Sequence, residues 1–101
     1  MARVIWTPEV FRNLDSIGDY MLEVAPAFAG PLLQRLYDAV APLEDYPRLG
    51  RAVPGFDRDD LRELIIDNYR IVYEIKGEAV WLVTIRHGSM NLEAWLRGRG
   101  F

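Results

Sequence analysis

Apolar residues recur at helical spacing through the first half of the chain. A short apolar stretch at residues 3–6 favours a strand, and Thr7 followed by Pro8 is typical of a helix start. The apolar stripe of this first helix consists of Phe11, Leu14, Ile17, Gly18 and Met21. A second helix is predicted from about Phe28 or Pro31 to Val40, because the residue before Pro26 is disfavoured in a helix. The two helices are expected to form an antiparallel hairpin.

The second half of the chain carries the signals of three strands instead. Residues 61–66, 69–75 and 80–87 are rich in β-branched and aromatic residues, and short turn sequences separate them. Before them, residues 47–60 are rich in Pro, Gly, Arg and Asp and are predicted to form a long loop. After them, residues 92–101 are expected to form one short helical turn and then fray.

Together these elements predict an α+β fold. An N-terminal strand and an α-helical hairpin precede an antiparallel β-meander, and the meander is expected to pair with the first strand. The helices should cover one face of the sheet and leave the other face partly open. That open face would present Arg70, and the strand end near it would carry Arg86 and His87.

Composition narrows the class of protein. The 101 residues suit one domain, and we expect residues 1–101 to form it. Half of the residues are apolar, 27% are charged and the mean hydropathy is −0.04, which is typical of a soluble globular protein. No apolar run approaches the ~18 residues of a membrane span, and the N-terminus lacks the apolar core of a signal peptide. We therefore expect a cytoplasmic protein that makes no contact with the membrane.

Charge is distributed unevenly along the chain. Residues 1–60 carry six Arg against ten acidic residues, a net −4, whereas residues 61–101 carry five Arg and one Lys against five acidic residues, a net +1. The overall charge of −3 is unlike the basic surface of a nucleic-acid-binding protein, so direct nucleic-acid binding is not expected. Eleven of the twelve basic residues are Arg, which suits forked hydrogen bonds to carboxylates as well as to phosphates.

Candidate chemistry centres on His87, the only histidine, where acid–base catalysis near neutral pH would start. With Arg70 or Arg86 stabilising a charged phosphate, His87 could assist RNA cleavage; the alternative is a structural hydrogen bond at a strand end. Arg70 lies in an apolar strand, so its charge requires either an open face or a carboxylate from Glu63 or Glu74. One His, no Cys and no nucleotide-binding motif predict neither a metal nor a cofactor.

Four segments carry a resemblance to a known family. They are Gly50–Arg51 in the loop, Leu61–Glu63 ("LRE"), Tyr69–Tyr73 ("YRIVY") and His87–Asn91 ("HGSMN"). In this combination, and with this order of elements, they resemble the ParE branch of the RelE/ParE superfamily of type II toxins over almost the whole chain. The resemblance implies a small α+β toxin encoded beside an antitoxin, whose disordered C-terminal segment folds as it wraps the toxin's groove.

The branch matters because function differs between branches of this superfamily. RelE-like members cut messenger RNA on the ribosome, whereas ParE-like members keep the fold and poison DNA gyrase. Arg70 matches the strand motif common to both, and His87 falls where some RNA-cleaving members carry a His. The aromatic residue expected next is Gly88 here, and the tail contains no Tyr. The resemblance therefore implies a gyrase-poisoning toxin. The alternatives are an endoribonuclease that uses His87, Arg70 and Arg86, and an inactive relative.

Two interaction surfaces are implied for such a toxin. The antitoxin is expected to pair acidic residues with Arg62, Arg70 and Arg86 and to add a strand or extended arm near the sheet. Its apolar seat on the hairpin is expected to comprise Phe11, Leu14, Ile17, Met21, Leu33, Leu36 and Tyr37. The target is expected to contact His87, Ser89, Met90, Asn91 and Trp95. The expected assembly is a toxin–antitoxin hetero-oligomer.

Overall fold

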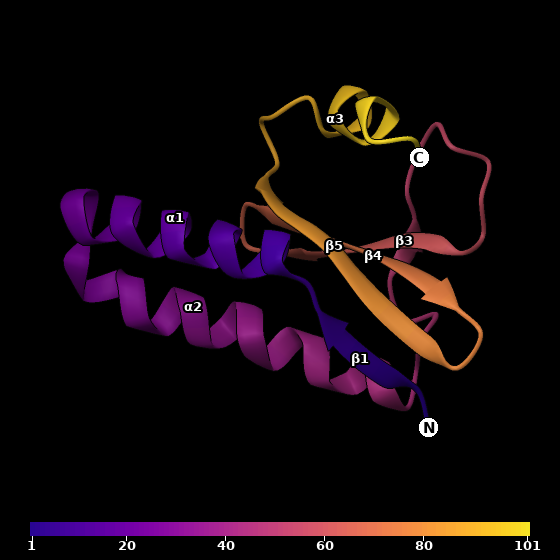
Figure 1. The fold of residues 1–101 in the computed structure, drawn as a ribbon. Coiled ribbons are helices and arrows are strands. Elements are labelled where there is room, and N and C mark those ends of the chain that lie inside the picture. Colours follow the sequence, from indigo (N-terminus) through magenta and orange to yellow (C-terminus); the bar gives the residue numbers. More distant parts are fainter.

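Five strands form one mixed sheet in the computed structural model, which describes residues 1–101 (Figure 1). The strands are β1 (Arg3–Trp6), β2 (Arg51–Ala52), β3 (Leu61–Ile66), β4 (Tyr69–Lys76) and β5 (Ala79–His87). Their order across the sheet is β1-β5-β4-β3-β2. The helices are α1 (Pro8–Val24), α2 (Pro26–Val40), the short 3-10 helix η1 (Ala41–Glu44) and α3 (Leu92–Gly98). The predicted α+β fold, with its N-terminal strand, helical hairpin and meander, is confirmed.

The strand pairing adds two features to the prediction. β1 pairs with β5, as expected, and the two strands run parallel, with Arg3 opposite Ala79. Within the predicted loop, β2 adds a fifth strand antiparallel to β3, with Arg51 opposite Glu63. Part of the predicted loop is therefore ordered by pairing with β3 at the edge of the sheet.

The outer edge of β5 is covered partly by β1 and partly by α1. β1 reaches only as far as Leu82 of β5. Beyond that point the Thr7 hydroxyl donates to the Leu82 carbonyl at 2.7 Å, and the Asn13 side-chain oxygen accepts from the Ile85 N–H at 3.0 Å. Two polar side chains of the first helical segment thus replace the hydrogen bonds that a longer β1 would make.

The hairpin boundary differs from the prediction. Ala25 is the single non-helical residue between the helices, and α2 begins at Pro26, earlier than Phe28 or Pro31. Proline suits the first helical position because its missing N–H is not needed there. Pro31 then lies inside α2, where Gly30 before it has no Cβ to clash with the proline ring.

The hairpin covers one face of the sheet and forms the main core. Its buried residues are Val10 and Ile17 of α1, Leu36 and Val40 of α2, Leu43 of η1, and Ile71, Tyr73, Val80, Leu82 and Ile85 of the sheet. The apolar residues of each helix recur at helical spacing and meet one side of the alternating strands. This packing places the base of the hairpin against the sheet and fixes its direction.

The opposite face of the sheet, expected to be partly open, is covered in part by α3, and Ile65 on this face stays 53% exposed. Val72 and Leu61 lie on that face and pack against Leu92 and Leu96 of α3, with Val53 beside them, and all five are buried. The tail therefore docks as a helix and does not fray. Two leucines at i and i+4 give α3 an apolar face that matches the apolar side chains of the strands.

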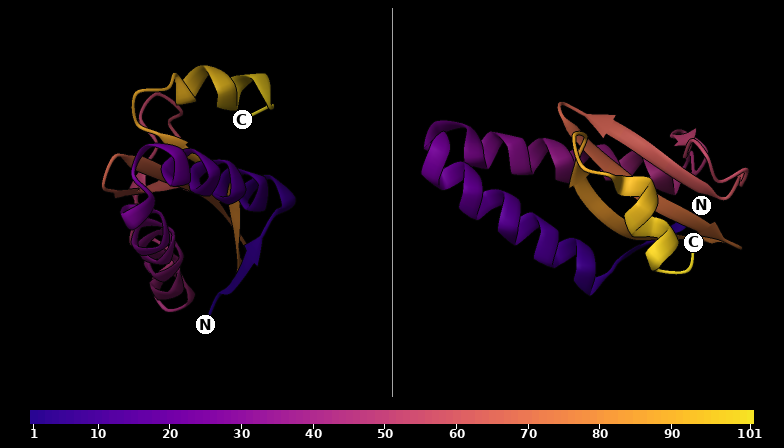
Figure 2. Two further views of the ribbon diagram at one scale, coloured as in Figure 1. Left: turned by 90° about the vertical axis from the view of Figure 1, so that its left-hand side faces the viewer. Right: turned by 90° about the horizontal axis from the view of Figure 1, so that it is seen from above.

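The hairpin is longer than the part of the sheet it covers. α1 contains 17 residues and so extends about 25 Å. Figures 1 and 2 show the joined ends of α1 and α2 projecting past the end of the sheet, while α3 crosses the other face. No helix combines the length and the apolar character needed to cross a bilayer.

Candidate functional site

The projecting half of the hairpin and the end of the sheet enclose a groove of about 910 Å³. Its apolar wall includes Ile17, Tyr20, Met21 and Val24 of α1 and Phe28 and Leu32 of α2. Its other wall is the end of the sheet, including Tyr69 at the start of β4 and Ile85 to His87 at the end of β5. The groove thus lies between two elements that the main core holds at a fixed angle.

Large apolar side chains on the groove are exposed. Tyr20 is 59% exposed, Val24 57% and Phe28 66%. They belong to the part of the hairpin that has no sheet beneath it, so nothing in the chain covers them. A contiguous exposed apolar surface of this kind marks a binding site for another molecule.

The structure divides the predicted apolar seat between several environments. Ile17 and Met21 line the groove. Leu36 is fully buried in the main core, and Leu14 and Leu33 pack against it. These three therefore support the hairpin from inside.

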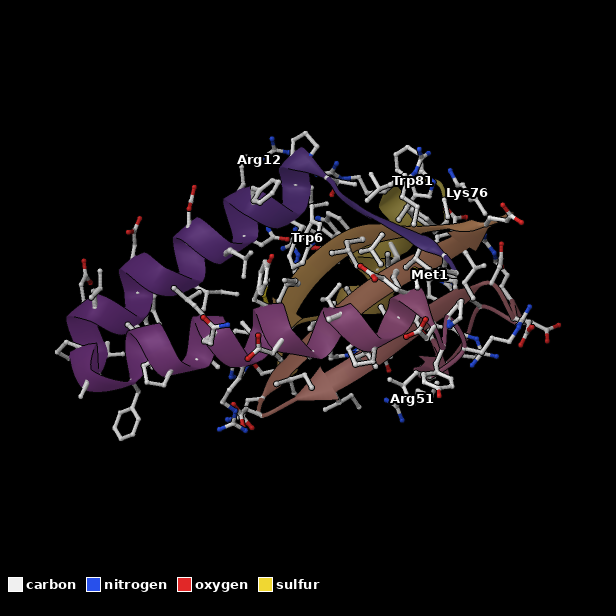
Figure 3. All side chains as sticks on the ribbon, turned by 90° about the horizontal axis from the view of Figure 1, so that it is seen from below. Met1, Trp6, Arg12, Arg51, Lys76 and Trp81 are labelled. Carbon is white, nitrogen blue, oxygen red and sulfur yellow. The ribbon has the colours of Figure 1, made fainter.

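Phe11 and Tyr37 lie outside the groove, on either side of Trp6. Their ring centroids lie 6.0 Å and 5.1 Å from that of Trp6, and both contacts are stacked. Figure 3 shows Trp6 between α1 and α2, at the base of the hairpin. Both outer residues remain exposed, at 54% for Phe11 and 58% for Tyr37. The aromatic stack fills the gap where the helices diverge.

An ion pair spans the groove at its sheet end. Arg35 of α2 donates to Asp67, in the turn between β3 and β4, at 2.6 Å. Both side chains are accessible, at 63% and 36% of their surface. A contact of this exposure adds little stability, so a partner could displace it at low cost.

His87 is held in a local turn at the end of β5. Its Nδ1 accepts the Ser89 N–H at 3.2 Å and lies 2.7 Å from the Ser89 hydroxyl. Because a backbone N–H can only donate, Nδ1 carries no proton, and the ring proton of neutral His87 is on Nε2. The ring also meets Tyr69 edge to face, with 5.4 Å between the centroids. To act as a base through Nδ1, His87 would first have to break this turn.

Arg70 is engaged by two carboxylates. It donates through Nε to Glu63 at 2.6 Å and through Nη2 to Glu93 of α3 at 2.8 Å, and only 12% of its side chain is exposed. Glu63, whose side chain is fully buried, also accepts from Arg51 at 2.7 Å. Burial alone would lower the pKa of Arg70, but the hydrogen bonds to Glu63 and Glu93 outweigh it and raise the pKa. Arg70 therefore joins the sheet to α3.

Arg62 is likewise used within the fold. It donates to the carbonyl oxygens of Asp59 and Gly50, at 2.8 Å and 2.6 Å, and to the Asp59 carboxylate. It thus holds the loop before β3.

Arg86 borders the groove and is only partly engaged. Its Nε donates to the Thr84 hydroxyl at 3.1 Å, and its Nη2 lies 3.5 Å from Glu9. Its guanidinium lies over the ring of Trp95, 4.3 Å from the centroid. Its second amino group, Nη1, has no hydrogen-bond partner in the chain. Of the three predicted arginines, Arg86 alone combines a place on the groove with a free donor.

The residues predicted to contact the target lie on and beside α3. Ser89 and Met90 line the groove, whereas Asn91 caps α3 by accepting the Ala94 N–H at 3.1 Å. Trp95 is held between Arg86 and Arg99, the latter 4.6 Å from its ring centroid. Asn91 and Trp95 therefore have structural roles in docking α3, and target contact by these residues stays a prediction.

Two of the three residues of the nuclease alternative, Arg70 and His87, come close at one place. Alternation along β4 and β5 directs Arg70 and Arg86 toward α3, and His87 toward the hairpin. At the strand end, however, His87 and Arg70 both border a second hollow of about 410 Å³. Arg51 and Glu93 border it as well. Arg51 is paired with Glu63, and Glu93 is paired with Arg70. No cluster of three or more His, Cys, Asp or Glu side chains could hold a metal ion.

Comparison with known proteins identifies the family. Residues 4–92 match the family described as ParE toxin of type II toxin-antitoxin system, parDE. The chain belongs to the ParE family of type II toxins. It is 34% identical to the toxin RelE2 of Caulobacter vibrioides over 90 residues, which cover 88% of this chain and 98% of the relative. It is also 34% identical to the toxin ParE3 of the same organism over 101 residues, which cover 95% of this chain and 96% of the relative.

Solved structures share the fold of this ParE-family toxin at lower sequence identity. A chain of the chromosomal ParDE toxin–antitoxin system from P. aeruginosa superposes with a TM-score of 0.73 at 22% identity, over 86% of this chain and 96% of that chain. A mutant of the E. coli toxin RelE in the free state superposes with a TM-score of 0.71 at 12% identity, over 100% and 99% of the two chains. Both branches of the superfamily thus share this fold.

Several groove residues of this ParE-family toxin carried no clear signal in the sequence. Val24 extends the same helical stripe as Ile17 and Met21, but the length of the hairpin beyond the sheet cannot be inferred from the stripe. Arg35 and Asp67 are 32 residues apart and meet only because α2 passes the turn between β3 and β4. The aromatic residues Tyr20 and Phe28, on either side of the predicted hairpin loop, were the available signal.

Proposed function

We propose that this ParE-family toxin is neutralised by a cognate antitoxin bound in the groove, and that free toxin poisons DNA gyrase. The observation that carries the antitoxin part is the exposed apolar groove, because a chain that leaves Tyr20, Val24 and Phe28 uncovered needs a partner there. The family description, which names a two-component parDE system, supports the same partner.

The groove suits a partner segment that is disordered when free. Its apolar wall runs along two helices, and an amphipathic helix can lay an apolar face into such a groove at i, i+3 and i+4 positions. A disordered segment can wrap a large surface and fold as it binds, and it would reach both the hairpin and the end of β5. The resulting assembly is a toxin–antitoxin hetero-oligomer in the cytoplasm, where gyrase is found.

Gyrase is favoured over messenger RNA because Arg70, one of the two cations of the nuclease alternative, is already neutralised. Arg70 would have to leave Glu63 and Glu93 to bind a phosphate, and Glu63 would then be a buried carboxylate held by Arg51 alone. Breaking a buried ion pair costs about 3–5 kcal/mol. In addition, His87 Nδ1 is occupied by Ser89. Membership of the ParE branch supports the same target.

The target is tested with purified toxin in two assays. We expect inhibition of gyrase supercoiling, with trapped cleaved DNA, and no cleavage of messages on translating ribosomes. Addition of the co-purified antitoxin should reverse the inhibition. Cleavage of messages that is abolished by His87→Ala would establish the nuclease alternative.

Overexpression in cells separates activity from inactivity. We expect growth arrest when the toxin is expressed alone and normal growth when the protein encoded by the adjacent reading frame is expressed with it. Normal growth in both cases would mean an inactive member of the family. A fold check by circular dichroism serves as the control, because an unfolded chain would give the same result.

A further inference from the structure

The end of β5 carries a free backbone edge inside the groove. Gly88 N–H donates to the Asn68 carbonyl at 2.6 Å, so by alternation the N–H and C=O groups of Arg86 face β4, and those of Ile85 and His87 face away from it. The last residue of β1, Trp6, lies opposite Leu82, so β1 does not reach the outward-facing groups of Ile85 and His87. The groove borders this edge, because Ile85, Arg86 and His87 all line it.

Two of the four outward-facing groups are already occupied. The Ile85 N–H donates to Asn13 at 3.0 Å, and the His87 carbonyl accepts from the Met90 N–H at 3.1 Å. The Ile85 carbonyl and the His87 N–H have no partner in the chain. Unpaired N–H and C=O groups at the edge of a sheet form a template on which another chain can add a strand.

The pattern of free and occupied groups selects one direction of strand. A parallel strand uses the C=O of one residue and the N–H of the residue two further on, and a single opposing residue bonds to both. An antiparallel strand would instead exchange both bonds with Ile85, or both with His87, and each of those residues has one group blocked. Only the parallel pairing fits, and it continues the direction in which β1 already runs along β5.

We infer that an extended segment of the antitoxin forms a parallel β-bridge opposite Arg86, donating its N–H to the Ile85 carbonyl and accepting the His87 N–H. This inference rests on the proposed function, since the antitoxin is the occupant. The segment enters the groove beyond Trp6, at the position that a longer β1 would take. It extends the sheet between β5 and the projecting part of α1.

The side chains around the bridge define the chemistry of the segment. The residue opposite Arg86 points to the same side of the sheet as Arg86, where Nη1 is free and Glu9 is the only carboxylate within 4 Å of the guanidinium. An acidic residue there would complete the guanidinium's hydrogen bonds. The residues before and after it point toward the hairpin, where Ile17 and Met21 line the groove. The segment is therefore an acidic residue between two apolar residues.

The test uses this toxin co-purified with the protein encoded by the adjacent reading frame. Amide hydrogen exchange, followed by NMR in the free toxin and in the complex, reports on His87 directly. We expect exchange of the His87 N–H to slow by at least about tenfold in the complex, the factor that corresponds to one modest hydrogen bond. The Gly88 N–H, which is already bonded to Asn68, is the internal control and should change less.

Two variant pairs test the backbone and the charge separately. His87→Pro removes the N–H and should weaken the complex about tenfold, whereas His87→Ala keeps the N–H and should have a smaller effect. Arg86→Gln should weaken the complex and reduce its sensitivity to salt, whereas Arg12→Gln, which also removes a partner of Glu9 but lies outside the groove, should not. Stability of each variant is measured by denaturation.

The outcomes separate this inference from the function on which it rests. A complex in which the His87 amide exchanges as fast as in the free toxin overturns the β-bridge, for example if a helix alone fills the groove, and leaves the antitoxin role intact. This outcome can be read even if His87→Pro does not fold. Failure of the two proteins to form any complex overturns both the bridge and the proposed partner.

Discussion

At the scale of single residues, Gly50 is a position where the fold tolerates no side chain. A Cβ added to Gly50 would lie 2.5 Å from the Glu63 carbonyl and 2.8 Å from the Tyr73 hydroxyl, which already accepts the Gly50 N–H. We predict that Gly50→Ala destabilises the toxin by about 1–3 kcal/mol, as overpacking of a core does. The matched control is Gly98→Ala in α3, where a Cβ has open space and the change should be neutral or slightly stabilising. Urea denaturation measures both, and equal stability of the two variants would contradict the prediction.

Glu93 gives the docking of α3 a dependence on pH. The hydrogen bond from Arg70 lowers the pKa of Glu93 below its unfolded value of about 4.3. The ion pair therefore stabilises the folded state above about pH 4.3, and its contribution is lost as the pH falls through the lower, folded-state pKa. We predict that Glu93→Gln is less stable than the parent at pH 7 and that the difference closes as the pH falls through the lowered, folded-state pKa of Glu93. Denaturation midpoints of both proteins at each pH measure this, and a difference that does not depend on pH would exclude the ion pair as its cause.

At the scale of elements, α3 is held by its buried leucines. Leu96 is completely buried on the sheet face opposite the hairpin. We predict that Leu96→Ala costs about 3 kcal/mol, because it removes buried methyl groups and leaves a cavity. Leu22→Ala, at a position that is 60% exposed on α1, is the control and should change stability by less than about 0.5 kcal/mol. A cost for Leu96→Ala no larger than that of the control would mean that α3 frays in solution.

At the scale of the whole molecule, the hairpin presents two exposed aromatic surfaces, and the groove is our choice for the antitoxin. We predict that Phe28→Ala, in the groove, weakens antitoxin binding by about tenfold or more, as the loss of an aromatic anchor does, and leaves stability unchanged. Phe11→Ala, in the stack with Trp6, should spare binding and cost about 0.5–1.5 kcal/mol of stability. Calorimetric titration and denaturation measure the two quantities. The reverse pattern would move the antitoxin to the stack at the base of the hairpin.

The elements themselves could be predicted from the sequence because their signals are local. Helical spacing over the hairpin, alternation over β3 to β5 and the Thr7-Pro8 cap are each set by neighbouring residues, and all were found at or near the expected positions. The start of α2 at Pro26 was missed because a proline inside a helix usually clashes with the residue before it. At Pro31 that residue is Gly30, which has no side chain, so the helix continues through Pro31. The family, too, could be identified from short motifs that follow one another along the chain.

Only the tertiary structure decided which of the candidate residues are free to act. Arg70 is neutralised by Glu93, 23 residues away in sequence, because α3 folds back over the sheet. Phe11 and Ile17 belong to one helical stripe, yet the first stacks on Trp6 and the second lines the groove, since the hairpin outruns the sheet. The Ile85 carbonyl and the His87 N–H are unpaired because β1 ends opposite Leu82, and Asn13 accepts only the Ile85 N–H. Each of these outcomes depends on where elements end relative to one another in space, and residue spacing along one element carries no information about that.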